Sequence, residues 1–86
     1  MKNLCRAIIW SASFLEESGD DIIDPDSAVK ALEDIATALQ EATSEEKAAF
    51  VATCAEEAER LQKEGAACFK TAEFVRGLPE ALGLCL

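Results

Sequence analysis

Four cysteines, at positions 5, 54, 68 and 85, are the side chains of this chain with the widest range of possible chemistry. A structural zinc site takes its thiolates from closely spaced pairs, but successive cysteines here lie 49, 14 and 17 positions apart. Small disulfide-bonded domains are also denser in cysteine. We therefore predict reduced thiols in a cytoplasmic protein, with Cys54 and Cys68 serving as small buried hydrophobic residues.

Catalytic side chains are poorly represented. The chain has no histidine and no tyrosine, so it lacks the usual general base near neutral pH and the usual partner of a nucleophilic cysteine. The acidic stretch from Asp20 to Asp26 does not follow the calcium-loop pattern, because it has no D-x-D-x-D-G run and no glutamate at the twelfth place. We predict a protein that is not an enzyme and that has no metal site and no cofactor.

The charge of the chain points to its class of partner. A formal net charge of -9 repels nucleic acids and anionic membrane surfaces, and no run of ~20 apolar residues could span a bilayer. Six acidic residues and no basic residue lie between positions 16 and 26. Asp24 and Asp26 fit the start of a helix. The candidates for binding a basic partner are therefore Glu16, Glu17, Asp20 and Asp21.

Helical patterns account for the first half of the chain. Residues 3–17 predict a helix with apolar side chains on most of its circumference, which must be buried on most sides or shared with a second subunit. Asp24 and Pro25 are typical of an N-cap followed by the first helical position, and they predict a second, amphipathic helix over residues 25–42. A third helix is expected to start at Thr43, with Glu46 as its capping-box partner, or at Ser44 alone. Because the link between the second and third helices is short, we expect them to form an antiparallel hairpin.

The second half of the chain carries one uninterrupted apolar seam. Its members are spaced alternately three and four residues apart, which is a heptad pattern over four heptads. Half of them are small enough to let another helix approach closely. The seam residues are Val51, Cys54, Ala58, Leu61, Gly65, Cys68, Ala72 and Val75.

Gly65 permits two interpretations of this seam. The unbroken apolar phase, and the lack of a capping residue between Gln62 and Cys68, favour one continuous helix over residues 44–76. The alternative is that Gly65 is a C′ glycine that ends the third helix and precedes a fourth. In either case we expect Gly77 to end the helix and Pro79 to open a short turn over residues 79–82.

The seam also leaves the identity of its packing partner open. It can pack against the first two helices within one subunit, or against a second copy of the chain. Antiparallel pairing of two copies about positions 62–63 would set Leu61 opposite Gly65, so that a large side chain meets the smallest one.

Together these patterns predict a single all-α domain over residues 1–86, a small antiparallel helical bundle completed by dimerisation. The predicted function is that of a small, acidic, cytoplasmic protein–protein interaction protein without catalytic activity, whose first partner is a second copy of itself. The alternative is an immunity-protein or antitoxin-like neutraliser that binds a basic protein through the acidic span 16–26.

Overall fold

The computed structural model describes residues 2–65 and 68–84, and within them every regular element is a helix. This confirms the predicted all-α class. The four helices, in chain order, are α1 (Lys2–Glu17), α2 (Pro25–Gln40), α3 (Ser44–Lys63) and α4 (Phe69–Ala81).

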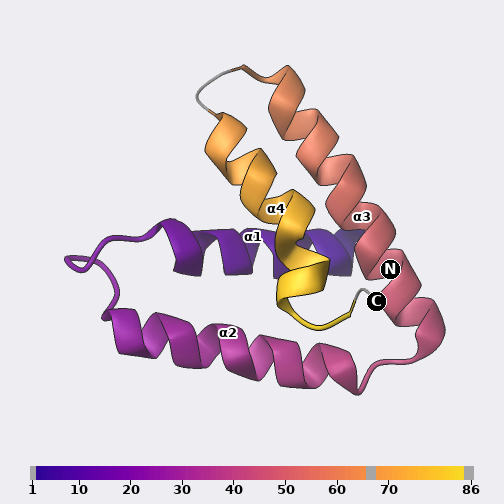
Figure 1. The fold of residues 1–86 in the computed structure, drawn as a ribbon, viewed down its shortest axis with the longest axis horizontal. Coiled ribbons are helices and arrows are strands. Elements are labelled where there is room, and N and C mark those ends of the chain that lie inside the picture. Colours follow the sequence, from indigo (N-terminus) through magenta and orange to yellow (C-terminus); the bar gives the residue numbers. More distant parts are fainter. Residues whose placement is uncertain (1, 66–67, 85–86) are drawn as a thin grey trace.

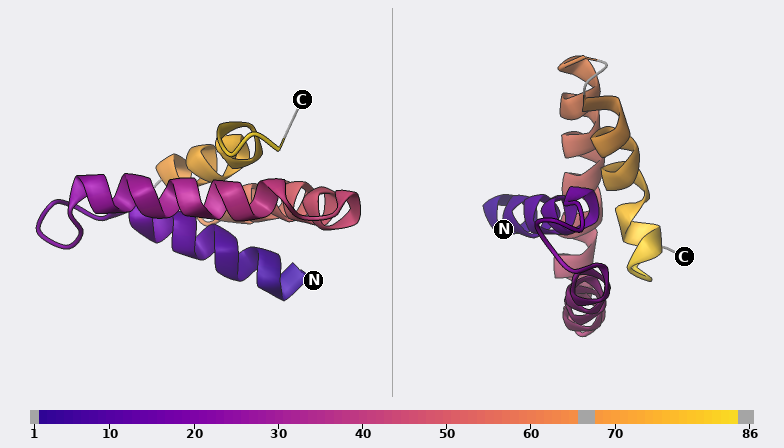
Figure 2. Two further views of the ribbon diagram at one scale, coloured as in Figure 1. Left: turned by 90° about the horizontal axis from the view of Figure 1, so that it is seen from below. Right: turned by 90° about the vertical axis from the view of Figure 1, so that its left-hand side faces the viewer.

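α3 and α4 run antiparallel, side by side, as a helical hairpin (Figure 1). α1 crosses one side of α3, and α4 lies on the opposite side (Figure 2). α2 packs chiefly on α1, and its last residue is tied to the end of α4 because Gln40 Nε2 donates to the Leu82 carbonyl at 3.1 Å. The core lies where α1, α3 and α4 meet, and it contains Cys5, Ile9, Ala12, Phe50, Cys54, Ala58, Val75, Leu78 and Leu82.

Two helix starts follow the predicted capping chemistry. The Asp24 carboxylate accepts from the Ser27 backbone N–H at 3.1 Å, and Pro25 occupies the first turn. Thr43 and Glu46 form a reciprocal capping box, with each side chain accepting from the other residue's backbone N–H. These bonds satisfy donors that a helix otherwise leaves without partners.

The interpretation of residues 44–76 as one continuous helix is wrong. α3 ends at Lys63, Gly65 has φ 117°, and α4 begins at Phe69. Such a positive φ favours glycine, so Gly65 stops the helix as the C′ alternative requires. α4 starts without a side-chain cap. Burial of the hairpin core therefore outweighs the ~1 kcal/mol that a good cap contributes.

The predicted helix end at Gly77 and turn at 79–82 are also wrong. α4 continues through Pro79 to Ala81, and the turn that ends it has Gly83 at φ 77°. A proline inside a helix costs ~3 kcal/mol. Here the helical course lets Leu78 and Leu82 enter the core, which offsets that cost. Leu84 packs against the same core, and Cys85 and Leu86 lie outside the described residues.

The expected hairpin of the second and third helices does not form. α2 and α3 diverge from their short connection (Figure 1), and the hairpin partner of α3 is α4. The reason lies in the seam, since Cys54 and Ala58 of α3 are buried in one cluster with Val75 of α4. The side of α3 that α2 was expected to cover is therefore already occupied.

The seam residues thus face one another within a single chain. Cys54, Ala58, Ala72 and Val75 are buried, Val51, Leu61 and Cys68 are half-buried, and Gly65 is exposed in the turn. Pairing of two copies about positions 62–63 requires a continuous helix, which Gly65 interrupts. That pairing is therefore incompatible with the arrangement of α3 and α4.

We predict opposite effects of alanine at two glycines. Gly65→Ala should lower the free energy of unfolding by ~1–2 kcal/mol, because an L-residue is strained at positive φ. Gly77→Ala should raise it by ~0.5–1 kcal/mol, because Gly77 lies inside α4 and alanine is the better helix former. A Cβ would meet no atom within 4 Å at either position, so the comparison isolates backbone conformation. Urea unfolding measures both, and a stabilising Gly65→Ala would contradict the break.

Candidate interaction site

α1 has a buried side and an exposed apolar side. Cys5, Ile9 and Ala12 are fully buried. On the opposite side, the positions spaced i, i+3, i+7 and i+10 form an exposed stripe in which Leu4 is 66% and Phe14 57% exposed. The stripe consists of Leu4, Ala7, Ser11 and Phe14.

This stripe continues into an apolar depression between α1 and α2. The depression has a volume of about 390 Å³ and is lined by Ala7, Ile8, Ser11, Ile35, Ala38 and Leu39. Its one hydroxyl, on Ser11, donates to the Ala7 carbonyl of the same helix. We call the stripe and the depression together the outer face. Since small-molecule sites carry a few placed polar groups that orient the ligand, a surface this uniformly apolar is more typical of protein contact.

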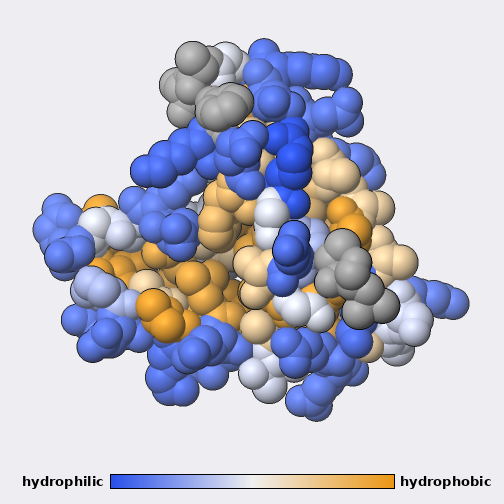
Figure 3. Space-filling model, viewed as in Figure 1, coloured by the Kyte–Doolittle hydropathy of each residue, from blue (hydrophilic) through white to orange (hydrophobic). Residues whose placement is uncertain are grey.

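α2 has no fully buried residue, although one half of its circumference is apolar. Some apolar residues of α2 do not belong to the outer face. They border a second depression of about 250 Å³, which we call the α2–α4 groove. Figure 3 shows apolar side chains gathered over this region and hydrophilic residues around them. The groove is lined by Glu16, Val29, Leu32, Glu33, Ala36, Phe74, Leu78, Ala81 and Leu82.

The acidic residues singled out in the sequence lie together at one end of the molecule. Glu16 and Glu17 close α1, and Asp20 and Asp21 follow in the connection to α2; all four are exposed. Within residues 2–65 and 68–84, none of the four takes part in an ion pair. Glu17 accepts a hydrogen bond from Thr71 of α4, which fixes the end of α1 beside α4.

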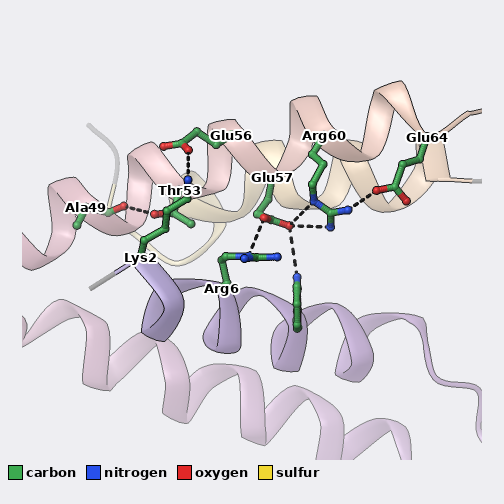
Figure 4. Close-up of polar contacts among 9 residues, drawn as sticks. Lys2, Arg6, Ala49, Thr53, Glu56, Glu57, Arg60 and Glu64 are labelled. Carbon is green, nitrogen blue, oxygen red and sulfur yellow. Dashed lines mark hydrogen bonds and ion pairs between the residues drawn. The ribbon is translucent and has the colours of Figure 1, made fainter.

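A buried carboxylate, which sequence reasoning missed, joins α1 to α3 (Figure 4). The Glu57 side chain is only 5% exposed, and its Oε2 accepts from Arg60 Nη2 at 2.9 Å and from Trp10 Nε1 at 3.4 Å. Arg6 Nε lies 3.0 Å from Oε1 as an ion pair, without the geometry of a hydrogen bond. The Arg6 guanidinium also lies 4.9 Å from the Trp10 ring centroid, a cation–π contact.

These contacts set the charge of Glu57. Desolvation by burial raises its pKa, but the hydrogen bonds from Arg60 and Trp10, with the charges of Arg60 and Arg6, outweigh that effect and leave the pKa below the usual value. The hydrogen bond to Glu57 in turn raises the pKa of Arg60. Glu57 is therefore an ionised structural link. Arg6 is a base within an otherwise apolar stretch, which hints at an ion pair. Its partner, Glu57, lies on α3 and is identified only by the fold.

Burial changes the reactivity of the Cys54 thiol. Desolvation, with a smaller contribution from neighbouring Cys5, raises the pKa of Cys54 to about 12. Because the thiolate is the reactive form, Cys54 acts as a small apolar side chain. In the part of the chain that the structure describes, no three His, Cys, Asp or Glu side chains gather around a possible metal position. Nor is any helix there long and apolar enough to cross a membrane.

We predict that Glu57→Gln lowers the free energy of unfolding by ~1–2 kcal/mol at pH 7. Breaking a fully buried ion pair costs ~3–5 kcal/mol, but the side chains of Arg6 and Arg60 are 33% and 44% exposed, so water offsets part of the loss. Glu56→Gln is the matched control, because Glu56 pairs with Lys2 in solvent and should change stability by less than ~0.5 kcal/mol.

The cost of Glu57→Gln should also depend on pH. The folded-state pKa of Glu57 is lowered, so its contribution is complete above the unfolded-state pKa of ~4.3 and is lost as the pH falls through the folded value. Urea unfolding of both proteins from pH 7 to pH 3 should show the difference shrinking. A difference that is the same at both ends would mean that the glutamine changes packing and not charge.

Comparisons of this chain with protein-family models, with curated proteins and with solved structures give no match.

Proposed function

We propose that this chain is a small, non-enzymatic protein–protein interaction protein that associates with a second copy of itself through the outer face. The observation that carries the proposal is the exposure of Leu4 and Phe14 on a helix whose opposite side is fully buried. Burying a large apolar side chain contributes ~1.5–3 kcal/mol. The same face of a second copy can bury these side chains.

The arrangement of the stripe supports pairing about a two-fold axis. Leu4 and Phe14 lie at its ends, and the small residues Ala7 and Ser11 lie between them. Both pairs are centred on position 9. Two antiparallel copies of α1 would therefore set Leu4 against Phe14 at each end and Ala7 against Ser11 near the axis, where small side chains let helices approach closely.

Charge opposes this association and makes it dependent on salt. Each copy carries a formal charge of -9, so two copies repel each other at low ionic strength. The apolar contact is not weakened by screening, whereas the repulsion is. Self-association should therefore strengthen as salt is added.

The non-enzymatic part of the proposal rests on the state of the titratable groups. The buried carboxylate of Glu57 is held by two arginines and an indole, and the Cys54 thiol is kept neutral. With no histidine or tyrosine in the sequence, a proton-transfer or nucleophilic centre would have to be built from exposed carboxylates and lysines. Reduced cysteines also suit the cytoplasm, which is the compartment we propose.

A second candidate function is the neutralisation of a basic protein, in the manner of immunity proteins and antitoxins. One observation favours it: Glu16 and Glu17 occupy the last turn of α1, where no basic residue is present. The negative end of the helix dipole makes carboxylates unfavourable there by ~0.3–1 kcal/mol each. A cationic partner would remove this cost.

We expect a dimer at micromolar concentration, with a mass near twice 9.2 kDa by light scattering. Leu4→Glu combined with Phe14→Glu should give a monomer of unchanged helicity, because both side chains are exposed and the core is untouched. Ile22→Glu is the control, since Ile22 is equally exposed but lies in the connection between α1 and α2. A mass of 9.2 kDa for the unaltered chain throughout the micromolar range would refute self-association.

A further inference from the structure

We infer that the α2–α4 groove, together with the carboxylates beside it, is a docking site for an amphipathic helix of another protein that carries lysines or arginines next to its apolar stripe. This inference rests on the proposed protein-interaction function but not on self-association. The two surfaces use different residues of α2, with Ile35, Ala38 and Leu39 on the outer face and Val29, Leu32 and Ala36 in the groove.

The size and lining of the groove suit a side-chain anchor. Leu78 and Leu82 are buried beneath it, while Val29 on its wall is 55% exposed. Its volume of about 250 Å³ is below the ~300–1,000 Å³ of small-molecule sites, yet above the ~150 Å³ that accommodates a benzene ring. One or two apolar side chains of a partner would fill it.

The groove extends towards the acidic end of the molecule. A neighbouring depression of about 180 Å³ shares Glu16, Val29 and Leu32 with it and adds Leu15, Ile23 and Asp20. The two depressions together form a track along α2 that is mainly apolar in the groove and of mixed polar and apolar lining near the loop that carries Asp20. A helix lying along this track would place successive apolar residues in the two depressions, which is the i, i+3, i+4, i+7 mode of helix-in-groove recognition.

The charges on the rim select the sign of the partner. The ionisable residues that line the groove are Glu16 and Glu33, and in the neighbouring depression Glu16 and Asp20. Glu16 also stands at the negative end of the α1 dipole, and the last turn of α1 contains no basic residue. A lysine or arginine flanking the partner's apolar stripe would meet these carboxylates and the dipole together.

The same charges argue against a second copy of this chain in the groove. The apolar half of α2 is flanked by Glu33, and by Asp34 in an exposed ion pair with Lys30. Docking it into the groove of another copy would set carboxylates against Glu16 and Glu33. Like charges placed together at an interface exclude the wrong partner, so the groove fits a basic helix from a different protein.

Three synthetic peptides of about 18 residues test the inference. The first has leucines at i, i+3, i+4 and i+7 with flanking lysines. The second replaces the lysines with glutamates, and the third keeps the lysines but scrambles the leucine positions. By calorimetry at about 50 mM salt, the first should bind on the order of tenfold more tightly than either of the others. If it binds no more tightly than one of them, the inference fails.

Variants of the protein locate the binding site. Glu16→Gln with Glu33→Gln should weaken binding of the first peptide by roughly fivefold or more and flatten its salt dependence. Val29→Ser should weaken binding but leave the salt dependence unchanged. The charge-matched control is Glu59→Gln with Glu80→Gln, because both residues line a depression between α3 and α4 that lies apart from the groove. Equal loss in the control and in the Glu16/Glu33 variant would mean general charge attraction and would overturn the site.

Light scattering on the same samples separates this inference from the proposed self-association. The Glu16/Glu33 and Val29 variants leave the outer face intact, so their mass should equal that of the unaltered protein. A monomer that binds the first peptide with the expected selectivity supports the groove and refutes the dimer. A dimer that shows no selectivity among the peptides supports the outer face and refutes the groove.

Discussion

Packing of α3 against α4 along one seam, half of whose side chains are small, is the interaction on which the rest of the structure depends. The turn at Gly65 brings the two halves of the seam together, so that Cys54 and Ala58 share a core with Val75 and Leu78. α1 completes this core with Cys5, Ile9 and Ala12, and the link from Glu57 to Arg6 and Trp10 fixes its position on α3. α2 contributes least to this core, since none of its residues is fully buried.

The core holds small residues at many positions, and several large apolar side chains lie outside it. Cysteine and alanine make up a large share of the buried set, while Leu4, Trp10, Phe14, Ile22 and Val29 are exposed. In a domain of 86 residues, the burial available within one chain is limited. Because the seam is filled by helices of the same chain, apolar faces of α1 and α2 remain exposed. Contact with another protein molecule would bury them.

Local chemistry was predictable from the sequence, and long-range packing was less so. The caps at Asp24 and Thr43 depend on neighbouring residues and were identified correctly.

The break at Gly65 was misjudged because an apolar seam keeps the same spacing whether the helix continues or folds back on itself, and periodicity cannot distinguish the two. Pro79 was misjudged because its cost is offset by burial of Leu78 and Leu82, and Glu57 was missed because its partners lie on another helix. The binding role of Glu16, Glu17, Asp20 and Asp21 stays a prediction, and only the fold places Glu16 on the wall of the α2–α4 groove and Asp20 in the depression next to it.

One chain completes the α3–α4 core, while the apolar faces of α1 and α2 remain exposed. Amide hydrogen exchange, measured at protein concentrations below and above the self-association midpoint, tests both parts together. We predict strong protection in α3 and α4 at both concentrations, and a gain of protection with concentration in the part of α1 around Ala7 and Ser11 and in the part of α2 around Ile35 and Ala38. A gain confined to α3 and α4, or weak protection of that hairpin at low concentration, would contradict the account.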